Sequence, residues 1–440
     1  MTREMKDSGI EWIGEIPDTW TLQRMKNCIA SRQSGAWGDE ASGEVGDAIC
    51  LRIADFDYSR FRFKDVPVEE LTLRHYSRDV IEALRLEKGD ILIEKSGGGE
   101  KTPVGRTVIF DKGYTALYAN FMDRLRCTNS MYPQYMQYVF VTFYKNDYSR
   151  NYIKQTTGIQ NLDLTSMLST EVVATPPIDE QIRIAEFLDR KCAEIDSVIA
   201  ATQRTIEEYK SLKQSIITEA VTKGVRGKRP MKDSGIEWIG DIPSDWKVAK
   251  IKHSIKWKSV KGNPDGTVLS LYRDYGVIPK DSRDDNHNVT SLDTSTYKVV
   301  DIGDFVINKM KAWQGSMAVS DYCGIISPAY HVCEITNPNI YKKYFHHLLR
   351  NHLYLPEYTR LSTGMRIGQW DLGYDDFKNL PFIIPSYDEQ VEIVEYIEEV
   401  CKKFDALIDS KTQLIEEMES YKKSVIYEYV TGKKEVPACQ

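Results

Sequence analysis

Two basic, glycine-containing segments hold the residue types best suited to binding a negatively charged ligand. The first reads KSGGGEK over residues 95–101 and is followed by Arg106, and the second reads KMKAWQG over residues 309–315. Glycine lets backbone N–H groups come close to phosphates, and lysine supplies positive charge. We expect DNA contacts here, and a plain hairpin turn is the alternative for either segment. The candidate contact residues are Lys95, Ser96, Gly97, Gly98, Lys101, Arg106, Lys309, Lys311, Trp313 and Gln314.

A second pair of segments follows further along the chain. TTGIQNLDLTSM spans residues 156–167 and STGMRIGQWDLGYDDF spans residues 362–377. Amide and guanidinium groups make bidentate hydrogen bonds with adenine and guanine. The candidates for such contacts are Gln160, Asn161, Arg366 and Gln369. The alternative interpretation is a structural turn that joins a module to the helix after it.

Residue patterns for catalysis are missing from the sequence. The only double proline, Pro176-Pro177, lacks the flanking residues of a DNA methyltransferase loop, and the phosphate-loop pattern GxxxxGK[ST] does not occur. Asp245 and Lys247 faintly resemble part of a nuclease site, but the first copy of that segment has no matching lysine. We therefore expect no active site, and neither a metal nor a cofactor in this chain.

An internal repeat organises the chain. MKDSGIEWIGEIPDTW (5–20) and MKDSGIEWIGDIPSDW (231–246) are identical at 13 of 16 positions. EFLDRKCAEIDSVI (186–199) and EYIEEVCKKFDALI (395–408) form a second, weaker repeat. Such self-similarity indicates that one structural plan is used twice.

The segments between the repeated blocks differ from each other. Residues 21–157 and 247–364 share only a faint echo, LEKGDILIEK (86–95) beside VDIGDFVINK (300–309). A common framework with divergent inserts suggests two modules that perform one task on two targets. Duplication followed by drift is the alternative, although drift alone would not spare some blocks so sharply while erasing others.

Each copy ends in a predicted helix of about 40 residues. From Asp179 onward, and again in the second copy, apolar residues follow a heptad pattern that places Lys213 and Lys422 at the same core position. A long helix with one apolar stripe needs a partner, so we expect the two helices to pair. Two independent helices, each folded on its own domain, are the alternative. The expected contact residues are Leu188, Cys192, Ile195, Ile199, Ile206, Tyr209, Ile397, Cys401, Phe404, Ile408, Ile415 and Met418.

The variable segments alternate short strand-like runs with glycine turns, and each then becomes more helical. The expected fold is α+β: two mixed α/β modules with pseudo-twofold symmetry, separated by two long helices that form an antiparallel coiled coil. The expected division of the chain is 1–177 for the first module, 178–224 for the first helix, 225–385 for the second module, and 386–440 for the second helix and the C-terminal tail.

Charge is unevenly distributed along the chain. The formal net charge is −7, from 58 Lys and Arg against 65 Asp and Glu, which by itself disfavours nucleic-acid binding. The variable segments 21–157 and 247–364, however, carry +2 and +5, whereas the helical regions 178–221 and 386–430 carry −3 and −7. Mildly basic modules on acidic helices are typical of a protein that touches DNA through the modules alone.

Composition excludes several other classes of protein. Hydrophobic residues make up 41% and charged residues 28% of the chain, which is typical of globular proteins. No run of apolar residues is long enough for a membrane span, and the N-terminus lacks the apolar core of a signal peptide. The 8 cysteines are scattered without a CxxC pair, as expected for free thiols in a reducing cytosol.

Together these features resemble the specificity (S) subunit of type I restriction–modification systems. The resemblance rests on the DSGIEWIGEIP and DSGIEWIGDIP repeats, the GDILI and GDFVI strands, the Thr-Gly turns at 157–158 and 363–364, and the PPIDEQ and PSYDEQ helix starts. It implies two target recognition domains that each read one half of a bipartite, asymmetric site in double-stranded DNA. It also implies that the helices set the length of the spacer between the half-sites.

The same resemblance implies a cytoplasmic, prokaryotic chain that is not itself catalytic. Two modification subunits would bind S-adenosylmethionine and methylate adenine, and two restriction subunits would use ATP and Mg. A self-sufficient, duplicated DNA-cleaving enzyme and a coiled-coil scaffold without a DNA role are the alternatives.

Overall fold

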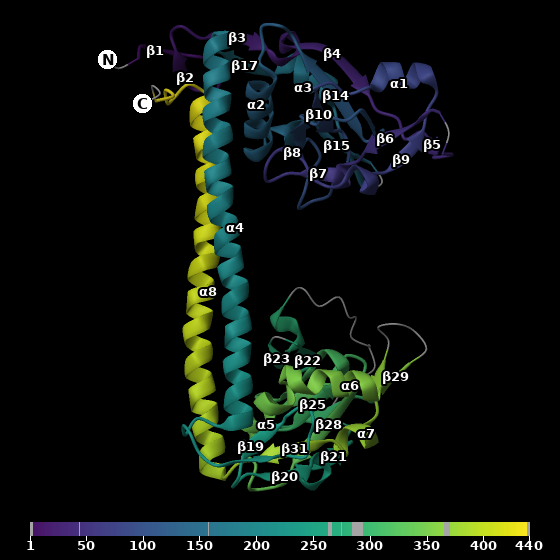
Figure 1. Cartoon of the computed structure of the whole chain (residues 1–440), viewed down its shortest axis with the longest axis vertical. Coiled ribbons are helices and arrows are strands. Elements are labelled where there is room, and N and C mark those ends of the chain that lie inside the picture. Colours follow the sequence, from purple (N-terminus) through teal and green to yellow (C-terminus); the bar gives the residue numbers. More distant parts are fainter. Residues whose placement is uncertain are drawn as a thin grey trace. The chain divides into compact units, whose positions relative to one another are not determined.

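The computed structural model describes residues 3–43, 45–156, 158–262, 266–273, 275–283, 294–364 and 370–437. The chain forms two compact units, which are described separately. Unit 1 consists of residues 1–204 and 411–440, and unit 2 of residues 205–410. Each unit therefore contains one variable segment together with portions of both long helices (Figure 1), whereas the sequence-based division assigns each helix to a region of its own.

A six-stranded sheet forms the centre of unit 1, in the order β4-β14-β10-β12-β8-β7. Neighbouring strands are antiparallel except β12 and β8, which run parallel. The strands are β4 (Ile29–Ser34), β14 (Met122–Cys127), β10 (Ile91–Glu94), β12 (Thr107–Ile109), β8 (Arg62–Phe63) and β7 (Phe56–Asp57). A second sheet in the order β13-β6-β9-β5 consists of β13 (Ala116–Tyr118), β6 (Asp47–Leu51), β9 (Leu73–His75) and β5 (Asp39–Glu40).

Strand β10 is buried on both faces. Successive side chains of a strand point to opposite faces, and each face of β10 packs against a different hydrophobic core. Ile91 and Ile93 pack into the core that contains α2 (Pro133–Lys145) and parts of both long helices. Leu92, between them, packs with residues of the second sheet, including Leu117. This short apolar strand therefore holds the two layers of unit 1 together.

Unit 2 repeats this plan on a smaller antiparallel sheet. Its strands, in order, are β21 (Ile255–Lys258), β28 (Tyr330–Ile335), β25 (Phe305–Asn308) and β26 (Met317–Val319). Phe305 and Ile307 of β25 pack into the core that contains α5 (Lys342–Leu349), and Val306 packs into the other core. The faint sequence echo between residues 86–95 and 300–309 therefore marks two equivalent strands, β10 and β25.

Shorter elements complete the units. Those of unit 1 include α1 (Arg78–Leu84), α3 (Leu164–Thr170) and the paired strands β3 (Thr21–Arg24) and β17 (Val172–Thr175). Those of unit 2 include α6 (Leu355–Leu361), α7 (Tyr374–Lys378) and the strand pairs β20 (Lys247–Lys250) with β31 (Pro381–Ile384), β22 (Leu269–Tyr272) with β23 (Gly276–Pro279), and β24 (Lys298–Val300) with β27 (Gly324–Ile326). The pairs β3–β17 and β20–β31 bring the two ends of each variable segment together.

The predicted long helices are α4 (Ile178–Lys223) and α8 (Tyr387–Val430), which lie side by side in each unit (Figure 1). In unit 1 the rings of Phe187 and Tyr429 are 4.5 Å apart. In unit 2 the rings of Tyr209 and Phe404 are 5.9 Å apart. α4 begins at Ile178, and the acidic residues Asp179 and Glu180 lie within its first turn.

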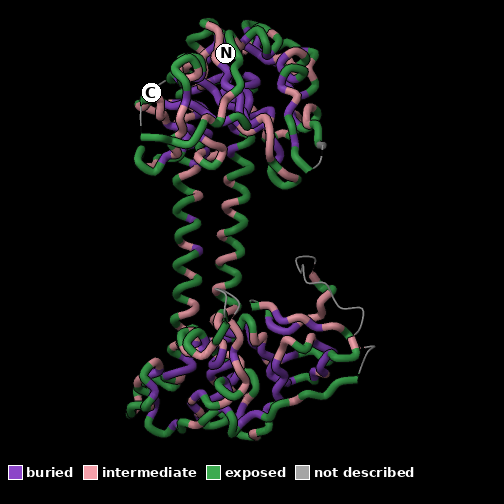
Figure 2. The backbone as a smooth tube through the Cα atoms, turned by 90° about the vertical axis from the view of Figure 1, so that its right-hand side faces the viewer, coloured by how far each residue is buried: buried purple, intermediate pink, exposed green. Residues whose placement is uncertain are grey.

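The side chains expected at the helix contacts are buried or half-buried in the structure. Leu188, Cys192, Ile195 and Ile206 are buried in α4, and Ile397 is buried in α8. The other expected contact residues, Ile199, Tyr209, Cys401, Phe404, Ile408, Ile415 and Met418, are half-buried. Half-burial follows from pairing only two helices, because the outer face of each helix stays in contact with solvent (Figure 2).

The near-identical sequence blocks form matching hairpins. β1 (Met5–Asp7) pairs with β2 (Glu15–Pro17) in unit 1, and β18 (Met231–Asp233) pairs with β19 (Asp241–Pro243) in unit 2. In unit 1, Tyr427 of α8 donates a 3.0 Å hydrogen bond from its hydroxyl to the carbonyl of Trp12. In unit 2, Ile236 packs in one core with Val221 of α4. Each hairpin therefore packs on the end of the helix that belongs to the other copy of the repeat.

Candidate nucleic-acid interface

The two predicted contact segments of unit 1 meet in one small sheet. β11 (Ser96–Gly97), β16 (Ile159–Leu162) and β15 (Ile153–Thr156) form it in that order, with Ser96 opposite Asn161. Ser96 also donates a 2.7 Å hydrogen bond from Oγ to Asn161 Oδ1. The structure therefore joins two sets of candidates that lie 65 residues apart in the sequence.

Unit 2 makes the equivalent junction between its own two segments. β29 (Ser362–Thr363) pairs with β30 (Asp371–Leu372) beside the second basic segment. Lys309 Nζ donates a 2.9 Å hydrogen bond to Asp371 Oδ2. The rings of Trp313 and Trp370 lie 5.2 Å apart, edge to face.

Several of the candidate side chains are free to meet a ligand. Lys101, Asn161, Lys311 and Gln314 are exposed, and Ser96 and Trp313 are half-buried. Gly97 is half-buried in β11, and Gly98, which follows it, is exposed. Arg366 and Gln369 lie outside the described residues.

Lys95 is held by an internal carboxylate. Its ammonium lies 2.8 Å from Asp123 Oδ1, and the Asp123 side chain is fully buried. Burial acts to raise the pKa of Asp123, but hydrogen bonds from Lys95, Ser34 and Arg32 outweigh burial, and the pKa is lowered. Lys95 therefore stabilises the base of the glycine turn. Its positive charge is partly neutralised by Asp123, so it would attract a phosphate less strongly than an unpaired lysine.

Arg106 and Gln160 also support the turn from within. Arg106 donates hydrogen bonds of 2.7 and 3.0 Å to the buried carboxylate of Glu94, and its guanidinium covers the ring of Tyr58 at 3.8 Å. Gln160 is buried, and its Oε1 accepts a 3.3 Å hydrogen bond from the Val104 N–H. This geometry favours a positioning role for both side chains over direct contact with a ligand.

Glycine is required at the centre of the turn. Gly98 has a φ of +61°, a conformation that other residues rarely adopt. A Cβ added there would lie 2.9 Å from the backbone N of Val104. Both the tight hairpin and the open approach to its N–H groups therefore depend on this residue type.

A basic cleft of about 360 Å³ opens beside the glycine turn. Its lining includes four cationic side chains, Lys101, Arg106, Lys145 and Arg150. Burial lowers the pKa of Lys145, and nearby charges contribute less. Arg106 pairs with Glu94 and Arg150 pairs with Asp147. A phosphate in this cleft would therefore be neutralised mainly by Lys101 and Lys145.

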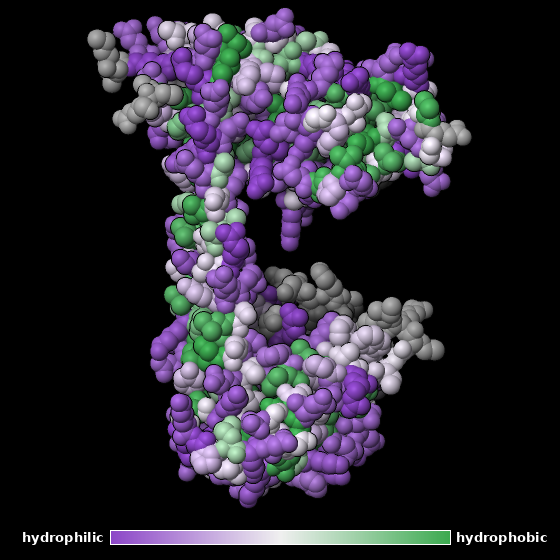
Figure 3. Space-filling model, in the orientation of Figure 1, coloured by the Kyte–Doolittle hydropathy of each residue, from purple (hydrophilic) through white to green (hydrophobic). Residues whose placement is uncertain are grey.

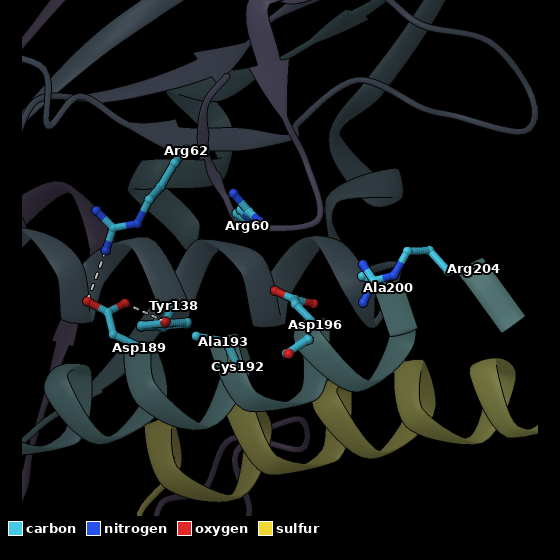
Figure 4. Close-up of a pocket in the computed structure, with 10 residues that line it drawn as sticks. Arg60, Arg62, Tyr138, Asp189, Cys192, Ala193, Asp196, Ala200 and Arg204 are labelled. Carbon is cyan, nitrogen blue, oxygen red and sulfur yellow. Dashed lines mark hydrogen bonds and ion pairs between the residues drawn. The ribbon is translucent and has the colours of Figure 1, made fainter. Parts of the chain in front are cut away.

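A larger cleft of about 490 Å³ lies between the β7–β8 hairpin and α4 (Figure 4). Arg62 donates a 3.0 Å hydrogen bond to Asp189 Oδ2, and the Tyr138 hydroxyl donates one of 2.6 Å to Asp189 Oδ1. Arg60 and Arg204 line the same cleft. Arg62 and Tyr138 belong to the variable segment, and Asp189 belongs to α4. Their hydrogen bonds to Asp189 therefore anchor the variable segment on the helix.

Sequence reasoning missed several buried polar contacts that both units share. Trp20 Nε1 donates a 3.1 Å hydrogen bond to Glu180 Oε2, and Trp246 Nε1 donates one of 3.1 Å to Glu389 Oε2. The signal was present, because these tryptophans and glutamates occupy matching positions of the two repeats. Sequence identity alone could not show that each tryptophan contacts the glutamate at the start of the long helix in its own copy of the repeat.

Gln181 and Gln390 have equivalent roles at the helix starts. Gln181 Oε1 accepts a 2.7 Å hydrogen bond from the Tyr132 N–H, and Gln390 Oε1 accepts one of 2.8 Å from the Tyr341 N–H. Both glutamines are fully buried. They tie the start of each long helix to the helix of the module beside it, which explains why the DEQ triplet occurs in both copies.

The type I restriction modification DNA specificity domain matches the chain over residues 78–208 and 243–420, which together span more than half of its length. The chain belongs to the type I restriction–modification DNA specificity family. This places it as a specificity subunit rather than an enzyme. The two matched ranges lie in the two halves of the chain, in agreement with the internal repeat of the sequence.

Known specificity subunits are similar to this chain over nearly all of its length. A Methanocaldococcus jannaschii chain assigned as the specificity subunit of the type I restriction enzyme MjaX is 23% identical, with 96% of this chain and 95% of that chain covered. A chain solved in work on complex assembly and conformational transition of the type I R-M system superposes with a TM-score of 0.67, at 13% identity and over 95% and 99% of the two chains. The HsdS subunit from Thermoanaerobacter tengcongensis has a TM-score of 0.50 at 14% identity, over 95% and 98%.

Among the described residues, no group of His, Cys, Asp and Glu side chains is arranged to hold a metal ion. No helix in the same part of the chain is long and apolar enough to cross a membrane.

Proposed function

We propose that this specificity subunit reads a bipartite, asymmetric site in double-stranded DNA, with one recognition segment on each half-site. The observation that carries the proposal is the contrast between a shared framework and different contact surfaces. Gln181 and Gln390 make equivalent hydrogen bonds, and β10 and β25 occupy equivalent central places. The turns that follow these strands differ, being KSGGGEK in unit 1 and KMKAWQG in unit 2.

The same contrast supports a common partner on the helices. The helical regions 178–221 and 386–430 are acidic, with net charges of −3 and −7, and they carry the second repeat. Two copies of one modification subunit, each bearing S-adenosylmethionine, suit two copies of one helical surface. Two restriction subunits that use ATP and Mg would complete a complex in the prokaryotic cytoplasm.

We propose further that the paired helices set the spacer between the half-sites. The heptad covers residues 185–216 of α4 and 394–425 of α8, and the two helices contain 46 and 44 residues. At a rise of about 1.5 Å per residue, each helix is roughly 65–70 Å long. In this proposal the length of the two helices determines the length of the spacer.

Methylation mapping tests the recognition role. The subunit is expressed with the modification subunit of its own system in a host without adenine methylation, and modified bases are located by sequencing. We expect one interrupted motif with two unlike halves, and no methylation when the specificity subunit is omitted. A continuous motif, or the same motif without the subunit, would contradict the proposal.

The purified chain tests the alternative of a self-sufficient enzyme. Incubated alone with DNA and either Mg²⁺ or S-adenosylmethionine, it should neither cleave nor methylate. Activity that persists through purification and is lost in D245A would establish the alternative instead.

A further inference from the structure

An apolar groove of about 430 Å³ lies in unit 1 beside the glycine turn. Its lining consists of Trp37, Arg52, Ile53, Ala54, Ala119, Asn120 and Phe121. Figure 3 shows hydrophobic side chains gathered on the part of unit 1 that carries β6 and β9, and residues 52–54 follow β6 directly. Such a patch on a folded unit indicates a binding surface.

Two large aromatic side chains of the groove are open to solvent. Trp37 is 41% exposed and Phe121 is 48% exposed. The guanidinium of Arg74 lies 4.7 Å from the centre of the Trp37 ring, on the rim. Within the described residues, the amide of Asn120 makes no hydrogen bond, so its donors and acceptor are available to a ligand. An apolar floor beside Arg and Asn side chains complements a base edge flanked by phosphates.

The groove is continuous with the candidate DNA contacts. The carbonyl of Phe121 accepts hydrogen bonds of 2.9 Å from Lys95 N–H and 3.3 Å from Ser96 N–H. Phe121 is therefore a backbone neighbour of the glycine turn, within reach of a duplex that contacts the turn. Base edges in the grooves of duplex DNA present one apolar group, the 5-methyl of thymine.

Unit 2 carries an alanine at the position equivalent to Phe121. Glu94 pairs with Met122 across β10 and β14, and Asn308 pairs with Tyr330 across β25 and β28. The residue before each of these partners is Phe121 in unit 1 and Ala329 in unit 2. A contact made by Phe121 therefore distinguishes the half-site of unit 1 from that of unit 2.

We propose that the groove between Trp37 and Phe121 reads the 5-methyl group of a thymine in the half-site bound by unit 1. The inference rests on the proposed function and adds the chemical group that this surface recognises. Phe121 packs against the methyl group, and the amide of Asn120, which lines the same groove, can hydrogen-bond to a base edge.

Single-atom changes in the DNA test the proposal. The assembled complex is titrated with duplexes in which each thymine of the mapped unit 1 half-site is replaced, one at a time, by deoxyuridine. We expect a loss of about 3- to 10-fold in affinity at one position, and none from the same replacements in the other half-site. F121A should lose a similar factor in affinity for the unmodified duplex, and deoxyuridine should cause no further loss. F121L should retain the preference for thymine over deoxyuridine.

A matched control checks that the loss belongs to the groove. Tyr322 of unit 2 is 44% exposed, so Y322A removes a comparable aromatic side chain and should bind as the unchanged complex does. Three outcomes would each overturn the proposal. F121A could bind DNA as tightly as the unchanged complex, or the mapped half-site could contain no thymine in either strand. F121A could also lose affinity while deoxyuridine has no effect. The last outcome would indicate a side chain wedged between bases. Failure of the unchanged complex to bind any specific site would instead contradict the proposed function itself.

Discussion

Lys422 of α8 donates 2.8 Å hydrogen bonds to both carboxylate oxygens of Asp196 on α4, within unit 1. The same ammonium donates to the carbonyl of Ser59 and lies 4.8 Å from the centre of the Phe61 ring. Its repeat counterpart in unit 2 is Lys213, which lies 2.6 Å from Asp405. The heptad predicted a lysine at this core position of both helices. In unit 1 that lysine also fastens the β7–β8 hairpin to the helix pair.

Replacing Lys422 by methionine should destabilise the chain more than the same change at Lys213. The Lys422 and Asp196 side chains are 9% and 17% exposed, so K422M leaves a mostly buried carboxylate without its cation, at a cost of about 2–3 kcal/mol. Asp405 is 57% exposed, and K213M should cost at most about 1 kcal/mol. Thermal unfolding of the full chain measures both, and equal losses would show that burial does not control the pair.

Acid should weaken unit 2 through its half-buried histidines. Burial lowers the pKa of His347 to about 4 and lowers that of His346, whose Nδ1 accepts a 3.2 Å hydrogen bond from Val319 N–H. The folded pKa lies below the unfolded value of about 6.5, so the stabilisation is complete above pH 6.5 and is lost as the pH falls toward 4.

The measurement is the urea midpoint of the full chain at pH 7.5 and at pH 5. Asn can accept the same hydrogen bond through Oδ1 without titrating, so H346N should reduce the pH dependence of the midpoint. An unchanged pH dependence in H346N would show that His346 does not carry a proton difference between the folded and unfolded states.

The sequence predicted the long helices, their pairing and the equivalence of β10 and β25, because heptads and the GD-strand pattern are local signals. It predicted less of the candidate interface. Arg106 was expected to face DNA, yet it pairs with Glu94, twelve residues earlier, across an interior that only the folded sheet creates. Phe121 was not singled out, because its exposure beside Lys95 depends on strand register rather than on spacing.

Lys101 and Arg106 should respond differently to truncation. Lys101 is exposed, so K101A should weaken DNA binding by the assembled complex roughly 5-fold and reduce the salt slope by about 1, with unfolding unchanged. R106A leaves the buried Glu94 unpaired and should cost about 3 kcal/mol of stability. Salt-dependent binding and thermal unfolding together separate these effects, and an unaltered salt slope in K101A would remove this residue from the interface.

Lengthening both helices should lengthen the DNA spacer. Seven residues inserted after Arg204 and seven after Ser410 keep the heptad and add about 10 Å to each helix, which corresponds to about three base pairs. Insertion into one helix alone breaks the pairing and should impair assembly. Methylation mapping reads the spacer directly, and a spacer of unchanged length in the double insertion would contradict the proposal that the helices determine it.

Exchange of residues 21–157 for the matching segment of another family member, followed by methylation mapping of the assembled complex, tests the two-module account most directly. The account predicts that one half of the motif changes while the other half and the spacer stay the same, and that exchange of residues 247–364 gives the reciprocal result. A change in both halves from either exchange would contradict independent recognition by the two units.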